Sequence, residues 1–421
     1  MVFGVLQLFQ IQGKSAENNL TPLELLGKHL FFDTNLSTPP GQSCAVCHVP
    51  GTGFVGNDSD LNAHGGVYEG AVEGRFSFRN PPTAAYAGES PVLYYNEKLT
   101  VPMWVGGMFW DGRATGWILG DPLAEQAQGP FLNPLEQNNP NPNDVVQKVM
   151  ISDYGDLFEE VWGNGSLNDV DGAYDKIARS IAAYERSSEV SPFTSKYDSY
   201  LANKTELTEL EAWGLDLFQG KALCAICHTS TLGPSGEPPL FTDFTYSNLG
   251  IPKNPENPFY YMPSEWNSDG ENFIDIGFGG FLKNAGYPPE VYELELGKHK
   301  VPTLRNVDLR PYPEFVKSYG HNGYFKSLEE IVHFYNTRDV EDWPEPEVSV
   351  NVLLLGNLGL TLDEETAVVA FMKTLNDGYD PKPPVSIVPV VLFGIFVVIF
   401  ACFVAFVVLK KYKTRTKLAS V

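Results

Sequence analysis

Two copies of one short motif, Cys-x-x-Cys-His, constrain this chain more than any other feature of its sequence. The first stands in GQSCAVCHVP at 41–50 and the second in KALCAICHTS at 221–230. Such a motif serves as a redox dithiol, as half of a zinc site or as the attachment point of a c-type haem. Only the haem uses every named residue, because the thiols bond the two vinyl groups and the imidazole binds the iron. The sequence therefore predicts two covalently bound haem c groups, attached through Cys44, Cys47, Cys224 and Cys227, with His48 and His228 as iron ligands.

A similar apolar segment precedes each motif, LGKHLFFD in the first case and WGLDLFQG in the second, which indicates a duplicated unit. Apolar residues recur at helical spacing elsewhere in the chain, whereas no stretch alternates like a strand. We therefore expect a mainly α fold. The expected segments are an N-terminal segment at 1–20, a first haem domain at 21–190, a second haem domain at 191–380 and a C-terminal segment at 381–421.

The C-terminal segment contains an uninterrupted apolar run at 385–409, followed at once by KKYKTRTK. As a helix this run extends over ~37 Å, which is enough to cross a hydrocarbon core of ~30 Å. The basic residues after it favour the cytoplasmic side. We therefore expect a single-pass anchor in the cell membrane, with both haem domains on the periplasmic or extracellular side. The N-terminal segment lacks a basic residue before Lys14, so it is either a remnant of a signal or the start of the fold.

The net charge of −23 argues against binding to nucleic acid, because a phosphate backbone requires a basic surface. An acidic surface is compatible with docking of a basic redox partner and equally with an ordinary solvated exterior. The second axial position of each iron is also open at this stage. The histidines outside the motifs are His29, His64, His299, His321 and His333, and spacing alone does not choose among them.

Several further motifs follow one another in a characteristic order, namely LGKHLFFD, RNPPT, FWDGRA, EQAQGP, PLE, VPTLRNV and SLEEIVHFYN. With them the chain resembles the di-haem cytochrome c peroxidase family. This family includes bacterial peroxidases and MauG-type enzymes, which mature a tryptophan-derived quinone in a partner protein. The resemblance implies two α-helical cytochrome c-like haem domains that face each other, a calcium ion between them and, in many members, a homodimer.

The resemblance assigns roles around the first haem, which is similar to the peroxidatic haem of the family. His64 matches a histidine that binds this iron at rest and leaves on activation, although MauG-type enzymes leave the position open. Glu136 matches the distal glutamate, which moves a proton between the two oxygens of bound peroxide. Gln126 matches the glutamine that accompanies it.

Other roles implied by the resemblance concern the region between the haems. Trp110, in FWDGRA, matches a tryptophan on the electron path between the two irons. Asn80, in RNPPT, matches a calcium ligand. The backbone carbonyls near Arg310 and Tyr312 are expected to complete the calcium site, since calcium prefers oxygen ligands.

The second haem departs from the usual peroxidase pattern. Its sixth ligand in typical peroxidases is a methionine, but the matching position here is Tyr335, the MauG-type residue. A phenolate favours ferric over ferrous iron, so this haem is expected to resist reduction by ordinary donors. The alternative is a tyrosine of the core, with Met262 or another loop residue as the ligand.

Three functions follow as hypotheses. The first is a peroxidase that reduces hydrogen peroxide with electrons from a cytochrome or similar redox protein. The second is a MauG-like enzyme that uses peroxide to oxidise a partner protein. The third is an electron carrier without enzymatic activity, with both irons fully ligated. Glu136, Gln126 and a displaceable His64 favour the two enzymes, and peroxide reduction is the leading prediction.

Overall fold

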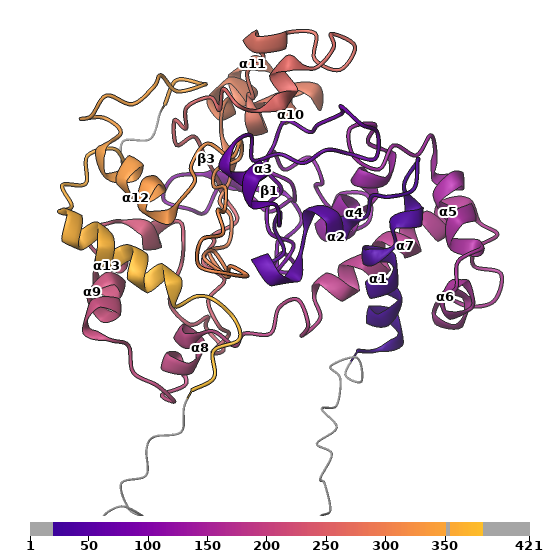
Figure 1. The fold of residues 1–421 in the computed structure, drawn as a ribbon, viewed down its shortest axis with the longest axis horizontal. Coiled ribbons are helices and arrows are strands. Elements are labelled where there is room, and N and C mark those ends of the chain that lie inside the picture. Colours follow the sequence, from indigo (N-terminus) through magenta and orange to yellow (C-terminus); the bar gives the residue numbers. More distant parts are fainter. Residues whose placement is uncertain (1–19, 351–353, 382–421) are drawn as a thin grey trace, which may run out of the picture. The chain divides into compact units, whose positions relative to one another are not determined.

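The computed structural model describes residues 20–350 and 354–381, in which helices and loops predominate (Figure 1). The α-helices are α1 (Pro22–Phe32), α2 (Cys44–Cys47), α3 (Ser59–Ala63), α4 (Pro122–Leu132), α5 (Pro142–Met150), α6 (Gly155–Trp162), α7 (Val170–Glu185), α8 (Lys196–Leu201), α9 (Glu209–Gln219), α10 (Gly277–Asn284), α11 (Pro289–Tyr292), α12 (Leu328–Thr337) and α13 (Leu362–Lys373). Short 3-10 helices are η2 (Thr34–Leu36), η3 (Pro50–Thr52), η4 (Cys224–Ile226), η5 (Pro258–Tyr261), η6 (Gly270–Asn272) and η7 (Glu293–Glu295). The prediction of a mainly α fold is confirmed for these residues.

The strands of the described residues are short and form two antiparallel pairs. The first pair joins β1 (Tyr94–Asn96) to β2 (Met103–Val105). The second joins β3 (Tyr246–Ser247) to β4 (His299–Lys300). With two or three residues each, these strands anchor loops. The buried Trp104 of β2 and Tyr246 of β3 pack with residues of α10 in a small hydrophobic cluster.

A first hydrophobic core forms where α1 and α7 cross (Figure 1). Thr21 starts α1 through a capping box with Glu24. Gly27 lets the two helices touch, because a Cβ at this position would lie 1.9 Å from the carbonyl oxygen of Ser180. The buried residues of this core lie within positions 26–190.

A second core repeats this arrangement with α9 and α13 (Figure 1). Thr208 and Thr361 start these helices through capping boxes of the same kind. A Cβ at Gly214 would lie 1.8 Å from the carbonyl oxygen of Ala367, so glycine again permits the close crossing. The buried residues lie within positions 197–375. Gly27 in LGKHLFF and Gly214 in WGLDLF thus each permit a close helix crossing, which explains why the segments before the two motifs are similar.

The described residues up to Tyr379 belong to one compact unit. Both cores belong to this unit, so the domain boundary at residues 190 and 191 stays a prediction. The predicted membrane-spanning run at 385–409 and its basic tail lie outside the described residues, as does the segment at 1–19. Among the described residues, no helix combines the length and apolar character needed to cross a membrane. The anchor therefore stays a prediction.

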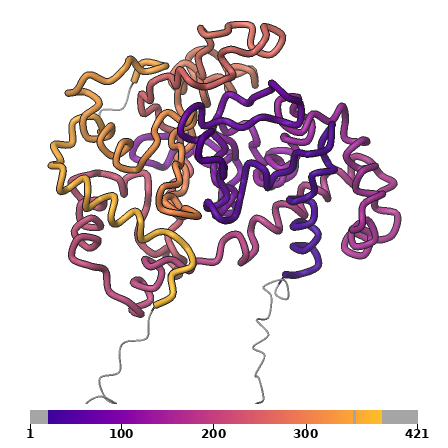
Figure 2. The backbone as a smooth tube through the Cα atoms, in the orientation of Figure 1, coloured from indigo at the N-terminus to yellow at the C-terminus, as the bar shows by residue number. Residues whose placement is uncertain are grey.

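The segment between the second motif and α10 winds as a loop with only short elements (Figure 2). Asparagine side chains attach it to the N-terminal part of the chain. The Asn254 Nδ2 donates to the Gly65 carbonyl at 2.9 Å, and the Asn257 Nδ2 donates to the Phe78 carbonyl at 2.9 Å. This loop therefore packs against the segment around the first motif.

Candidate haem sites and the groups around them

The first motif forms α2, and His48 ends this helix. The His48 Nδ1 lies 3.1 Å from the carbonyl oxygen of Phe54. A carbonyl oxygen can only accept, so Nδ1 carries the ring proton and Nε2 keeps a lone pair for a metal. Burial lowers the pKa of His48, which stabilises the neutral imidazole that an iron ligand requires.

The second motif repeats this geometry at η4. The His228 Nδ1 lies 2.7 Å from the carbonyl oxygen of Phe241, so its Nε2 also keeps a lone pair. Burial lowers the pKa of His228 as well. Both histidines are thus oriented through Nδ1 by a backbone carbonyl, in the manner of metal ligands that are held by an outer hydrogen bond.

The four motif cysteines form no disulfide and are half-buried. Burial raises the pKa of Cys44, and it raises the pKa of Cys47 to about 12, of Cys224 to about 12 and of Cys227 to about 11. Zinc binding and dithiol redox chemistry both require thiolates, which this environment disfavours. Haem attachment consumes the thiols as thioethers, so the donor set fits two c-type haems.

A cavity of about 1160 Å³ adjoins the second motif. It is larger than typical small-molecule sites of ~300–1,000 Å³. Its wall includes Cys224, Cys227, His228, Tyr335 and Met372. The wall continues to the region of the first motif with Gly53, Val55, Pro82 and Trp110. The second motif therefore opens onto a space that suits a large planar cofactor.

Tyr335 lies on α12 and faces this cavity. Burial, reinforced by the nearby thiols of the second motif, raises the pKa of the Tyr335 phenol. Met262 packs in a separate aromatic cluster, where its sulfur accepts the Phe76 N–H at 3.3 Å. The buried Met372 on α13 does line the cavity, and the sequence offered no reason to select it. The structure thus places Tyr335 at the second motif, and its bond to iron stays a prediction.

Glu136 lies near the first motif, since its charge contributes to the raised pKa of both Cys44 and Cys47. Burial raises the pKa of Glu136, and the positive charge of Arg113 opposes this shift. The Asn133 Nδ2 donates to the Glu136 Oε1 at 2.8 Å and orients the carboxyl group. A carboxyl group with a raised pKa is suited to both giving and taking a proton.

The loop after His64 lies directly against the Glu136 loop. The Ala71 N–H donates to the Glu136 carbonyl oxygen at 2.6 Å. A Cβ at Gly70 would lie 2.4 Å from the carbonyl oxygen of Leu135, so a larger residue does not fit there. The glycine-rich composition of this loop therefore reflects a close backbone approach.

Other polar groups surround the first motif that the sequence did not single out. Tyr68 lies near enough to Cys47 for this thiol to contribute to the raised pKa of the Tyr68 phenol, whose hydroxyl donates to the Asn62 Oδ1 at 3.1 Å. The Gln42 Nε2 donates to the Glu69 carbonyl at 2.9 Å. Arg113 belongs to the FWDGRA motif, whereas Tyr68 and Gln42 lie in none of the motifs that carry the resemblance.

Gln126 is half-buried on α4, in the same helix that leads to the Glu136 loop. His64 ends α3 and is exposed, with its Nδ1 2.7 Å from the Asp60 carbonyl oxygen. The Lys326 ammonium donates to the His64 carbonyl. A role of His64 as an iron ligand therefore requires this loop to move inward, and the roles of both residues stay predictions.

Trp110 connects the RNPPT segment to the second half of the chain. Its Nε1 donates to the Asn80 carbonyl at 2.8 Å, and its own carbonyl accepts the Lys300 N–H at 2.8 Å. Trp110 also lines the cavity, and the resemblance assigns it to the electron path between the irons. That role stays a prediction.

The expected calcium site, with Asn80 and the carbonyls near Arg310 and Tyr312, stays a prediction. The Asn80 Nδ2 contacts the carbonyl oxygens of Ser318 and Gly320, at 3.2 Å each. Arg310 instead donates to the Phe315 carbonyl at 2.6 Å. Tyr312 is exposed. The carbonyls that contact the Asn80 side chain thus belong to the end of the RPYPEFVKSYG segment.

Comparison with known proteins shows which family this chain belongs to. Residues 22–206 match the family model described as di-haem cytochrome c peroxidase. The methylamine utilization protein MauG of Paracoccus denitrificans is 34% identical over 376 residues, covering 85% of this chain and 90% of that protein. The cytochrome c551 peroxidase of Nitrosomonas europaea is 29% identical over 364 residues, covering 86% and 82%. The diheme peroxidase BthA from Burkholderia thailandensis superimposes with a TM-score of 0.70 at 30% identity, covering 85% and 86%.

Proposed function

The chain belongs to the di-haem cytochrome c peroxidase family and is an oxidoreductase that uses peroxide, and we propose that it reduces hydrogen peroxide to water at the first motif. The observation that carries this proposal is the half-buried Glu136 beside Cys44 and Cys47, with its raised pKa. In this proposal, two electrons enter from an external redox protein through the second haem, and two protons complete the conversion of one peroxide molecule to two water molecules.

The residues around the first motif supply proton chemistry. When bound, the haem supplies the iron at which peroxide reacts. Burial raises the pKa of Glu136, which favours a proton on its carboxyl group. Asn133 keeps one oxygen of this group in place through its hydrogen bond of 2.8 Å. A positioned carboxyl group of this kind contributes typically 10²–10⁴-fold to a rate.

A second candidate function is the MauG-like oxidation of a partner protein. Tyr335 favours this second function. The phenol of Tyr335, and not a methionine, is predicted to bind the second iron, and Tyr335 lines the cavity of the second motif. A haem with a tyrosine ligand resists reduction, which suits removal of electrons from a protein more than storage of an electron from a donor. Met372 in the same wall is the competing ligand.

The finer parts of the proposal concern location, calcium and assembly. We keep the single-pass anchor at 385–409, which places the haem domains on the extracytoplasmic side of the cell membrane. A homodimer is retained from the family resemblance. Calcium fits Asn80 with the carbonyls of Ser318 and Gly320, because a half-turn of the Asn80 amide would bring three oxygens together.

Steady-state turnover of hydrogen peroxide with a reduced cytochrome tests the proposed function, together with EPR of the ferric protein. The expected result is turnover and a high-spin ferric signal, either at rest or after partial reduction. Turnover only with a protein substrate as electron source would select the MauG-like function. Absence of both turnover and high-spin iron would leave the electron carrier.

A further inference from the structure

The His64 loop, residues 59–66, is attached to a distant part of the chain. The loop begins with α3 and ends at a glycine. The Val316 N–H donates to the Ser59 Oγ at 3.0 Å, and the Asn62 Nδ2 donates to the Val316 carbonyl oxygen at 3.0 Å. The first turn of the loop is therefore fixed to the segment 315–326, which leads into α12.

Lys326 anchors the other end of the His64 loop. Its ammonium group donates to the carbonyl oxygen of His64 and, at 2.7 Å, to the carbonyl oxygen of Gly323. Hydrogen bonds from a charged donor are shorter and stronger than those between neutral groups. Lys326 is half-buried and lies just before α12, whose buried residues pack in the second core. The backbone at His64 is thus attached to a helix of the second core.

The residues after His64 are held by an amide and by close backbone packing. The Asn254 Nδ2 donates to the Gly65 carbonyl at 2.9 Å and lies 3.1 Å from the Asn322 carbonyl oxygen. Gly66 has a φ of +69°, and a Cβ there would lie 2.9 Å from the Cα of Gly323. A larger residue does not fit at this position, so the loop and the segment 315–326 touch directly.

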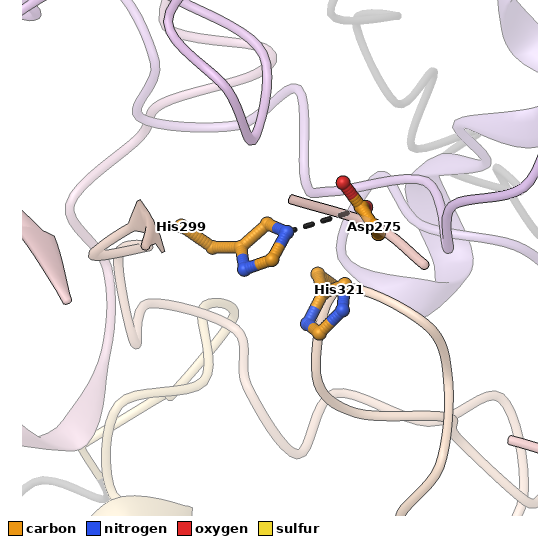
Figure 3. A group of neighbouring side chains, drawn as sticks. All are labelled: Asp275, His299 and His321. Carbon is orange, nitrogen blue, oxygen red and sulfur yellow. Dashed lines mark ion pairs between the residues drawn. The ribbon is translucent and has the colours of Figure 1, made fainter. Parts of the chain in front are cut away.

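The segment that receives these contacts is itself fixed by the buried His321 (Figure 3). The His321 ring stacks on the His299 ring, with centroids 3.6 Å apart. The His299 Nε2 lies 3.2 Å from the Asp275 Oδ2, as the dashed line in Figure 3 marks. The Asn80 N–H donates to the His321 carbonyl oxygen at 2.7 Å. Because several other segments hold it, this segment is a firm support for the His64 loop.

The side chain of His64 has the chemistry of a metal ligand but points into solvent. Its Nδ1 lies 2.7 Å from the Asp60 carbonyl oxygen, which can only accept, so the ring proton resides on Nδ1. The Nε2 keeps a lone pair, as it does in His48. His64 is exposed, whereas Val67 and Tyr68, which follow it, are buried. The position of the backbone, rather than the state of the ring, therefore keeps His64 from acting as a ligand.

We propose that Lys326 is a positioning residue that holds His64 away from the iron of the first haem, so that this iron keeps an open coordination position in the resting ferric protein. The inference rests on the proposed function, since an open position matters where peroxide reacts. Without the ammonium group, the carbonyls of His64 and Gly323 lose their charged donor. The loop then turns inward about Gly65 and Gly66, and the Nε2 of His64 binds the iron.

EPR and absorption spectra of the full-length, haem-loaded ferric protein, recorded without peroxide, test this proposal. The natural protein is expected to show a high-spin signal from the first haem. Lys326→Met keeps the apolar stem of the side chain and removes the charge. We expect the ratio of low-spin to high-spin first haem to rise at least about tenfold in this variant, because hydrogen bonds from a charged group are lost. Adding His64→Ala to Lys326→Met is expected to restore the high-spin signal.

Lys253 provides the matched control. It is half-buried like Lys326, and its ammonium group donates to the carbonyl oxygens of Glu271 and Phe273, which lie outside the His64 loop. Lys253→Met is therefore expected to give the spectrum of the natural protein. His64→Ala alone is expected to leave the spin state of the natural protein unchanged, a result that does not depend on how the lysine variants fold.

Three results would overturn the proposal. The first is an unchanged high-spin signal in Lys326→Met. The second is a low-spin signal that persists when His64→Ala is added, because another ligand would then be responsible. The third is a natural protein whose first haem is low-spin and becomes high-spin in His64→Ala. Because no peroxide is added, these results are independent of turnover. The expected spin changes in a protein without peroxide turnover would support the role of Lys326 and contradict the proposed function.

Discussion

The two Cys-x-x-Cys-His motifs are alike in their local geometry and different in what faces them. His48 and His228 each use Nδ1 to contact a backbone carbonyl, at 3.1 and 2.7 Å. The first motif lies near two carboxylates, since both Glu185 and Glu136 contribute to the raised pKa of the Cys44 thiol. The second opens onto a cavity lined by Tyr335 and Met372 from α12 and α13.

This difference separates proton chemistry from electron transfer. Peroxide reduction requires protons at the reacting oxygens, and the first motif has a carboxyl group with a raised pKa nearby. Electron transfer requires no such group, and the second motif has a phenol and a thioether within its cavity instead. In the proposed function, the two motifs therefore serve different purposes because the fold brings different residues opposite them.

The largest expected effect comes from removing one motif at a time. Replacing Cys44 and Cys47 together by Ser is expected to lower the haem content from two to one per chain and to abolish peroxide turnover. The matching replacement of Cys224 and Cys227 is expected to lower haem content equally but to leave the first site able to react once with peroxide. Pyridine haemochrome analysis and rapid mixing with peroxide measure both. Two haems in either variant would contradict covalent attachment at that motif.

The next effect tests the acid of the first site. Glu136→Gln keeps the size and the hydrogen bond to Asn133 but cannot hold a transferable proton. We expect kcat/KM for peroxide to fall about 10²–10⁴-fold. The exposed acid of the neighbouring loop supplies the control, and Glu69→Gln is expected to retain activity. A decrease of less than about tenfold in Glu136→Gln would show that another group moves the proton.

A smaller effect is expected from the phenol of the second site. Tyr335→Met is expected to raise the reduction potential of the second haem by the order of 100 mV, because a thioether stabilises ferrous iron relative to a phenolate. Redox titration followed by absorption measures this. Tyr335→Phe removes the ligand without supplying another and separates ligand loss from ligand exchange. An unchanged potential in both variants would assign the ligand role to Met372.

The smallest effect concerns stability and the second acid of the first site. Burial raises the pKa of Glu185 to about 8 from an ordinary value of 4.5. Between these values the folded state holds a proton that the unfolded state has lost, so the free energy of unfolding falls as pH rises. Glu185→Gln is expected to remove this decline, which amounts to as much as ~4 kcal/mol between pH 5 and pH 8. Urea unfolding at both pH values measures it, with the exposed Glu160→Gln as control. Parallel declines in all three proteins would contradict the shift.

Some residues of the fold and the sites were predictable and others were not. The helical periodicity before each motif predicted α1 and α9, and the motifs themselves placed the haem attachment. Asp275, His299 and His321 could not be grouped from the sequence, because no short-range pattern relates residues in three separate loops and strands. The contact of Asn80 with the carbonyls of Ser318 and Gly320 could not be predicted either, since the path of this loop depends on packing.

The sequence by itself determined the covalent chemistry, because two thiols and an imidazole within five residues need only a turn of backbone to act together. It also determined the duplicated helix crossings, since a glycine in each apolar segment permits the contacts at Ser180 and Ala367. Only the tertiary structure decided which groups face each motif. Glu136 and Tyr335 acquire their environments from segments far away in the chain, and burial, which raises the pKa of both, exists only in the folded protein.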